Sequence, residues 1–286
     1  MKLLFEKVAK KVNLSTERLQ KYKDWIGDAN KARNLKFPLL DARMNQYDKA
    51  EELISFYTFA PLELRRDKED VIREVLSLVD VNVPIEGKIK LTFEKQFKPP
   101  DGYLAWLKDK IDEHPVRYIR EQGKQHTGNH KRLETNTHVD VVLESAKLLI
   151  LIEMKFTSDI SVQTTFNANR NQLARMIDVG ISEVENSKGK KLVVLLCTPY
   201  EFFAKKSRFF YYKIQEYVDS QKIAQGIGWR KPWEIEQHLL KIDWLSLEKV
   251  IEIMYQKFES PEFDEAMTFF EERKLLLHSD IEKRRA

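Results

Sequence analysis

The sequence predicts an α/β fold in which helices flank a central mixed sheet and an added helical region precedes it. Residues 148–152 (LLILI) and 191–199 (KLVVLLCTP) have the length and aliphatic content of strands buried on both faces. Residues 170–186 between them have helical periodicity. A buried strand directly after a helix is typical of a parallel crossover onto the same sheet.

The N-terminal third is expected to be helical. Apolar side chains recur at helical spacing at Tyr47, Ala50, Leu53, Ile54 and Tyr57, and residues 68–79 repeat the pattern. Proline, glycine and one candidate strand fall within residues 81–100, so we place a boundary there. The expected parts are a helical region (1–95), an α/β core (96–240) and C-terminal helices that pack on the core (241–286).

Within the core, Asp101 is expected to begin a helix that Pro115 ends. Residues 116–122 are expected to form a strand, and residues 138–144 and 148–156 a hairpin with its turn at 145–147. Helices are expected over 208–224, 246–260 and 262–277.

Composition favours a soluble, cytoplasmic protein. A single cysteine, Cys197, excludes an internal disulfide and fits a reducing compartment. Charges at Lys2, Glu6 and Lys7 interrupt the first residues, so no secretory leader is expected there. The apolar runs are far shorter than the roughly 18 residues of a membrane span, and no Gly-rich phosphate loop is present.

The distribution of positive charge says more than the net charge of +4. One basic segment, 117–132, contains Arg117, Arg120, Lys124, Lys131 and Arg132. A second, 205–213, interleaves four aromatic residues with Lys205, Lys206, Arg208 and Lys213. Such segments suit phosphate contact and base stacking, although for either segment alone a solvated surface over buried aromatics is the preferred interpretation.

Three charged residues mark the two strands of the expected hairpin. Glu153 and Lys155 interrupt the apolar strand and project from one face, since side chains alternate along a strand. Asp140 on the neighbouring strand is expected opposite them. Carboxylate oxygens are hard ligands that suit Mg²⁺, and an adjacent ammonium can stabilise negative charge on a phosphate.

The pattern Asp140 … Glu153-Met154-Lys155 resembles the signature of the PD-(D/E)XK nuclease superfamily, which has the restriction-endonuclease-like fold. The resemblance covers residues 101–199 and implies that Asp140 and Glu153 bind the metal while Lys155 assists the attacking water. Some members carry a Gln/Arg pair on the next helix. Gln172 and Arg175 stand there in this sequence, with Arg170 close by as a candidate phosphate contact.

The sequence departs from the family pattern in two places. Val139 replaces the proline of the motif. The acid that members often carry on the first helix is not clearly assigned: Glu113 is the preferred candidate for a further metal ligand, and Glu52 and Glu121 are alternatives.

Other polar groups admit more than one interpretation. A zinc site from His126, His130, His138 and Cys197 has no standard ligand spacing, so a polar loop before a strand is the preferred interpretation. His138 shares the face of Asp140. Residues 157–159 (Thr-Ser-Asp) suit either a phosphate contact or a turn.

The sequence therefore predicts an endonuclease that uses Mg²⁺ or Mn²⁺ to hydrolyse phosphodiester bonds in DNA, with RNA as an open alternative. A role in prokaryotic defence or repair follows only by analogy with the family. Lys131, Arg132, Lys205, Lys206 and Arg208 are expected to bind the nucleic-acid backbone. Cutting both strands with one site per chain favours a homodimer. Two alternatives are a catalytically silent binding module on the same fold and a helical N-terminus that docks a partner protein.

Overall fold

A five-stranded mixed sheet forms the centre of the molecule, with strand order β1-β2-β3-β4-β5. The computed structural model describes residues 7–9, 11, 12, 14, 17, 18, 20, 44–125, 134–156, 158–164, 166–204, 208–256 and 261–271. The strands are β1 (Lys90–Phe97), β2 (Thr137–Glu144), β3 (Leu148–Met154), β4 (Lys191–Thr198) and β5 (Leu239–Ser246). Strands β1 to β3 are antiparallel neighbours, and β4 and β5 continue the sheet in parallel.

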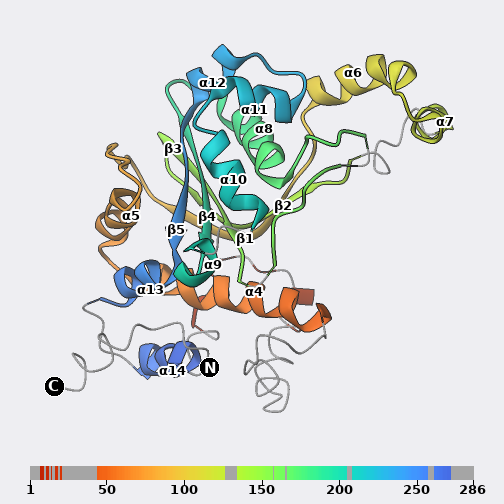
Figure 1. The fold of residues 1–286 in the computed structure, drawn as a ribbon. Helices are drawn as coiled ribbons and strands as arrows, with labels where there is room; N and C mark the ends of the chain where they lie inside the picture. Colours follow the sequence, from red (N-terminus) through yellow and green to blue (C-terminus); the bar gives the residue numbers. More distant parts are fainter. Residues whose placement is uncertain are drawn as a thin grey trace.

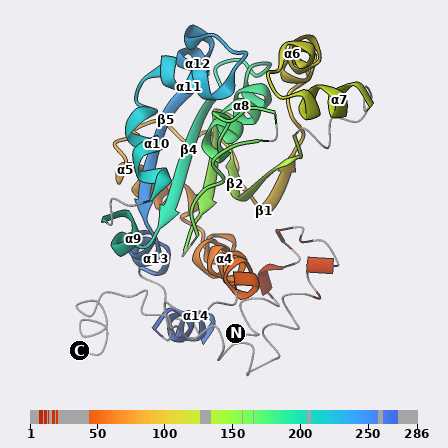
Figure 2. The same cartoon turned by 45° about the vertical axis from the view of Figure 1, so that its right-hand side comes forward.

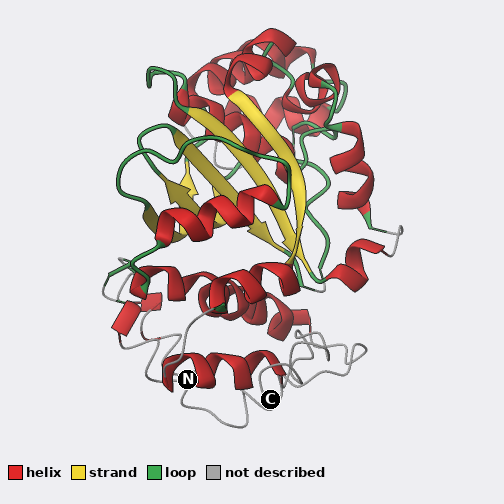
Figure 3. Cartoon of the chain, turned by 90° about the vertical axis from the view of Figure 1, so that its left-hand side faces the viewer, coloured by secondary structure: helices red, strands yellow, loops and turns green. Residues whose placement is uncertain are grey.

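Helices cover both faces of this sheet (Figures 1 and 3). One group consists of α4 (Met44–Phe59), η1 (Ala60–Leu64), α5 (Lys68–Ser77), α13 (Leu247–Tyr255) and α14 (Pro261–Glu271). The other consists of α8 (Gln172–Val184), α10 (Phe209–Glu216), α11 (Ser220–Ile227) and α12 (Pro232–His238). The short α9 (Tyr200–Ala204) follows β4.

Alternating side chains divide the sheet between two hydrophobic cores. Val141, Ile150 and Val193 pack with the group that contains α4, α5, α13 and α14. Their neighbours Val142 and Leu151 pack with α8 and α10 to α12. Burial on both faces explains why β3 and β4 are almost continuously apolar.

A third, smaller assembly stands beside the sheet. It comprises α6 (Asp101–Lys110), η2 (Ile111–Glu113) and α7 (Arg117–Gln125), which lie together away from α4 in Figures 1 and 2. Tyr103, Leu107 and Phe166 form its core.

The predicted α/β class, with a mixed sheet flanked by helices, is confirmed. The hairpin and the parallel crossover through 170–186 are also present as expected. Three local predictions are wrong. Residues 117–122 belong to helix α7 instead of a strand, residues 208–224 contribute to two helices, and β5 was not expected. Strand β1 crosses the expected boundary between residues 95 and 96.

Candidate functional site

The hairpin of β2 and β3 brings the motif residues together. Leu143 lies opposite Ile150 and Val141 opposite Ile152, so the register carries Asp140 to the end of β3. There the Asp140 carboxylate accepts a hydrogen bond from the backbone N–H of Met154, at 2.6 Å. This contact holds Asp140 against Met154, which stands between Glu153 at the end of β3 and Lys155 directly after the strand, as the sequence predicted.

Lys155 links two carboxylates at this end of the sheet. Its Nζ lies 2.8 Å from Glu153 Oε1 and 3.6 Å from Glu51 Oε2 on α4. Glu51 Oε1 also accepts hydrogen bonds from the backbone N–H of Phe156 at 2.9 Å and from the Ser158 hydroxyl at 2.8 Å. Glu51 therefore ties α4 to the segment that carries Lys155.

Helix α8 reaches the same carboxylate from the other side. The Gln172 amide donates a hydrogen bond to Glu153 Oε1 at 2.5 Å, and its oxygen accepts one from the Ser161 N–H at 3.2 Å. Asn171 caps the helix by accepting from the Ala174 N–H, which places Gln172 in the first turn. Arg175 lies one turn further along, and its buried Nε has no partner among the residues described.

Glu94 on β1 completes the group. Its backbone has φ 52°, a left-handed conformation that is uncommon for a residue other than glycine. The ladder between β1 and β2 pairs Phe93 with Val141 and Lys95 with Val139, so Glu94 and Asp140 lie between these pairs. The charge of Glu94 is close enough to Asp140 to raise the pKa of that carboxyl group, and Arg18 lies 3.4 Å from the Glu94 carboxylate. We call Glu51, Glu94, Asp140, Glu153 and Lys155 the acidic cluster.

Burial and mutual repulsion change the protonation of this cluster. Desolvation, then the nearby Glu52, raises the pKa of Glu94 to about 7. Desolvation, followed by the charges of Glu153 and Glu94, raises the pKa of Asp140 well above its ordinary value. Desolvation also raises the pKa of Glu153, although Lys155 opposes that shift. The carboxyl groups therefore lack enough positive charge to compensate for their removal from water.

The lysine shows the opposite balance. Burial lowers the pKa of Lys155, but the carboxylates of Glu153, Glu51 and Asp140 outweigh this effect and raise the pKa above its ordinary value. Lys155 therefore remains an ammonium at neutral pH. It can contribute positive charge, but in this arrangement it cannot accept a proton from water.

The structure does not bring every predicted site residue to this cluster. Glu113 ends η2, in the assembly beside the sheet, where it forms an exposed ion pair with Lys110 at 2.7 Å. Glu121, one alternative, pairs with Arg117 on α7. Glu52, the other alternative, lies close enough to Glu94 to raise its pKa. The helix that contributes an acid to the cluster is therefore α4, through Glu51, and not the segment that ends at Glu113.

The prediction that Arg170 contacts a phosphate is wrong, because its side chain is completely buried. The guanidinium donates to Glu134 at 2.7 and 2.8 Å and to Asp178 at 2.9 Å. It also lies 3.7 Å from the centre of the Tyr103 ring. Arg170 is thus a structural residue that connects α8 to neighbouring segments.

The other predicted contacts are only partly described. Arg208 is the N-cap residue of α10, and its guanidinium lies 5.5 Å from the centre of the Phe202 ring. Asp159 accepts hydrogen bonds from the backbone N–H groups of Phe209 and Phe210, so it anchors this helix. The remaining positions lie outside the described residues: Lys131, Arg132, Lys205, Lys206, His126, His130 and Thr157. The side chain of Lys124 is likewise not described.

Sequence reasoning missed two members of the cluster. Glu51 could have been found, because it lies four residues after Tyr47 and three before Ile54 within an otherwise apolar helical stripe. A buried acid in such a stripe needs a partner. Glu94 gave no such signal, since its role depends on the pairing of β1 with β2.

The acidic cluster fits a divalent cation in one respect. The Oε2 atom of Glu153 is buried and accepts no hydrogen bond from the residues described. Within those same residues, no group of three or more His, Cys, Asp or Glu side chains is arranged to hold a metal ion. Mg²⁺ usually takes only one or two protein carboxylates and retains waters. Asp140 and Glu153 could supply these two ligands.

Comparisons with protein-family models, with curated proteins and with solved structures find no match to this chain. No helix in the described part of the chain is long and apolar enough to cross a membrane.

Proposed function

We propose that this protein is a Mg²⁺- or Mn²⁺-dependent endonuclease that hydrolyses phosphodiester bonds in DNA, built on a restriction-endonuclease-like fold. One observation carries the proposal: Asp140, Glu153 and Lys155 meet at the end of two adjacent strands. The order of elements supports the fold, since helices α6 and α7 precede the hairpin of β2 and β3, and helix α8 and strand β4 follow it.

In this proposal Asp140 and Glu153 hold the cation. When bound, the cation polarises the phosphate and lowers the pKa of a coordinated water. The raised pKa values of both carboxyl groups agree with a site that a cation would relieve of excess negative charge.

Three further side chains support these ligands. Lys155 stays protonated and places a positive charge beside the negative charge that develops on the phosphate. Glu51 holds Lys155 and the backbone that follows it. Gln172 fixes the orientation of Glu153. The role of Lys155 in this proposal is electrostatic, because an amine with a raised pKa stays protonated at neutral pH and cannot act as a base.

The test is cleavage of supercoiled plasmid with Mg²⁺, Mn²⁺ or EDTA. We expect nicking by the unmodified protein with either metal and none with EDTA. The substitutions Asp140→Asn and Lys155→Met should each reduce the rate by about 100-fold or more. Glu113→Gln is the matched control, since it removes an exposed acid from a different assembly and should leave the rate unchanged.

One result would contradict the assigned metal site, and another would favour the alternative function. Normal nicking by Asp140→Asn would remove the assigned metal site. Salt-dependent binding to DNA without cleavage in either metal would favour the silent binding module. A parallel assay with a single-stranded RNA substrate decides between DNA and RNA.

A further inference from the structure

Strand β5 leaves one edge of the sheet open. It is the last strand in the sheet order, and within the described residues only β4 pairs with it. The backbone N–H of Trp244 is directed away from β4, because it donates to the side chain of Asp243 at 2.8 Å. Alternation along a strand gives Ile242, two residues earlier, the same outward direction. The Trp244 N–H already has this side-chain partner, so the outward backbone groups of Ile242 are the ones offered to another strand, and an open strand edge is a template for such pairing.

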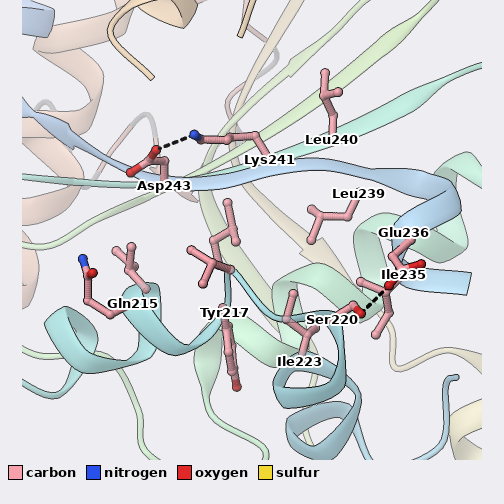
Figure 4. A pocket seen from close by; sticks show the side chains of 13 residues that line it. Gln215, Tyr217, Ser220, Ile223, Ile235, Glu236, Leu239, Leu240, Lys241 and Asp243 are labelled. Carbon is pink, nitrogen blue, oxygen red and sulfur yellow. Dashed lines mark hydrogen bonds and ion pairs between the residues drawn. The ribbon is translucent and has the colours of Figure 1, made fainter. Parts of the chain in front are cut away.

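A groove of about 490 Å³ lies beside this edge (Figure 4). Ile214, Tyr217, Ile223 and Ile235 contribute apolar side chains to it, and Ile242 borders it from the strand. Val218, which also lines the groove, is 84% exposed. An open strand edge therefore adjoins a partly apolar depression.

We propose that β5 of a second copy of this chain pairs antiparallel with β5, which joins two five-stranded sheets into one. The charges of β5 are complementary to those of a second, antiparallel β5. Lys241 and Asp243 stand two residues apart on one face of the strand and form an ion pair at 3.1 Å within the chain. When a two-fold axis passes through Ile242, each Lys241 lies directly opposite the Asp243 of the other copy.

No other register of this antiparallel pairing places Lys241 directly opposite Asp243. An axis through Lys241 would place two lysines opposite each other, and an axis through Asp243 would oppose two aspartates. Opposite charges in directly facing positions stabilise a strand pair, while like charges destabilise it. The charge pattern of β5 is therefore self-complementary in one register only.

The shape of the strand agrees with this register. An irregularity between Leu192 and Val193 in the pairing with β4 leaves Leu240 as an extra residue, so regular extended backbone begins at Lys241. In the proposed dimer, the two Ile242 side chains face each other across the axis. Because each borders a groove, the two grooves become continuous and lose contact with water at their meeting point.

The proposed interface is separate from the acidic cluster. Asp140 and Glu153 lie on β2 and β3, and β4 stands between them and β5. The oligomeric state can therefore be tested without any assumption about nuclease activity.

The experiment is analytical ultracentrifugation of the full chain, for which the protomer mass is 33.9 kDa. We expect a dimer whose dissociation constant rises about 10-fold or more in Lys241→Asp, since each interface would then contain two pairs of facing acids. The double variant Lys241→Asp/Asp243→Lys restores opposite charges across the axis and should recover the dimer.

Hydrogen exchange locates the interface independently. The backbone amides over residues 239–246 should exchange more slowly in the unmodified protein than in Lys241→Asp at the same concentration. Circular dichroism shows whether the single variant remains folded. A monomeric unmodified protein at 100 µM, about the range of a weak specific dimer, would overturn the proposal. So would a dimer that both variants leave unchanged, because its interface would lie elsewhere.

Discussion

Two groups of buried charges lie close to helix α8, and they differ in how completely they are paired. The first, which we call the balanced cluster, contains two arginines and two acids: Arg170, Arg230, Glu134 and Asp178. The second is the acidic cluster, in which Lys155 faces several carboxylates. Both groups are removed from water, so each must compensate for the cost of burying charge.

The balanced cluster compensates fully. The guanidinium of Arg170 donates hydrogen bonds to Glu134, to Asp178 and to the backbone carbonyl of Ile227. Arg230 donates to Asp178 at 2.6 Å and to Glu185 at 2.9 Å. Opposite charges and matched hydrogen bonds of this kind are typical of a structural network.

The acidic cluster leaves part of its charge uncompensated. Buried oxygens of Glu94 and Glu153 have no hydrogen-bond partner in the described part of the chain. The pKa values of Glu94, Asp140 and Glu153 are all raised. Unequal pairing of these largely buried charges thus separates a group that stabilises the fold from one whose uncompensated charge agrees with the proposed cation site.

Removing the centre of the balanced cluster should have the largest effect on stability. We expect Arg170→Met to lower the free energy of unfolding by about 3–5 kcal/mol, because it leaves Glu134 and part of Asp178 buried without a partner. Urea denaturation measures this change. Arg73→Met is a suitable control, since it breaks an exposed ion pair with Asp70 and should cost less than about 1 kcal/mol. Equal losses in both variants would refute the distinction.

Removing a charge from the acidic cluster should instead raise the free energy of unfolding at alkaline pH. The pKa of Glu94 is raised from 4.5 to about 7 in the folded protein. The folded state therefore holds this proton more tightly, and the associated stability is present below pH 4.5 and lost as the pH rises through 7.

Glu94→Gln removes this dependence. At pH 8 the variant should be more stable than the unmodified protein by about 1–3 kcal/mol, and the advantage should shrink towards pH 4.5. Denaturation curves across this range provide the measurement. A variant that is less stable at pH 8 would show that the ionised Glu94 is well compensated.

A smaller effect is expected from the residue that orients Glu153. Gln172→Met removes the hydrogen bond to Glu153 Oε1 and keeps a side chain of similar length. If the protein is a nuclease, we expect the cleavage rate to fall about 10-fold and the unfolding free energy to change by less than about 1.5 kcal/mol. Plasmid nicking and denaturation of the same preparation test both parts. An unchanged rate would remove Gln172 from the site.

The two clusters also differ in how far they can be predicted from the sequence. Asp140, Glu153 and Lys155 were predictable because β2 and β3 form a local hairpin whose register the apolar pattern determines. The burial of Arg170 was not predictable, since its guanidinium donates to Glu134 and to the backbone carbonyl of Ile227, which are both far from it in the sequence. An arginine in a polar segment gives the same sequence signal in either environment.

Strand β5 illustrates a second limit. Its sequence, LLKIDWLS, mixes charged and apolar residues because it lies at an edge and is only partly buried. The continuous apolar pattern that identified β3 and β4 depends on burial between two helical layers. An edge strand lacks that pattern, so only the parallel pairing with β4 reveals it.

The claim that the acidic cluster is built for a divalent cation is tested most directly by calorimetric titration with Mn²⁺ at pH 8. We expect the unmodified protein and Glu113→Gln to bind with the same affinity, and Asp140→Asn to bind at least 10-fold more weakly. Equal affinity in Asp140→Asn, or no binding by the unmodified protein at millimolar Mn²⁺, about the weak end of protein cation sites, would contradict the account.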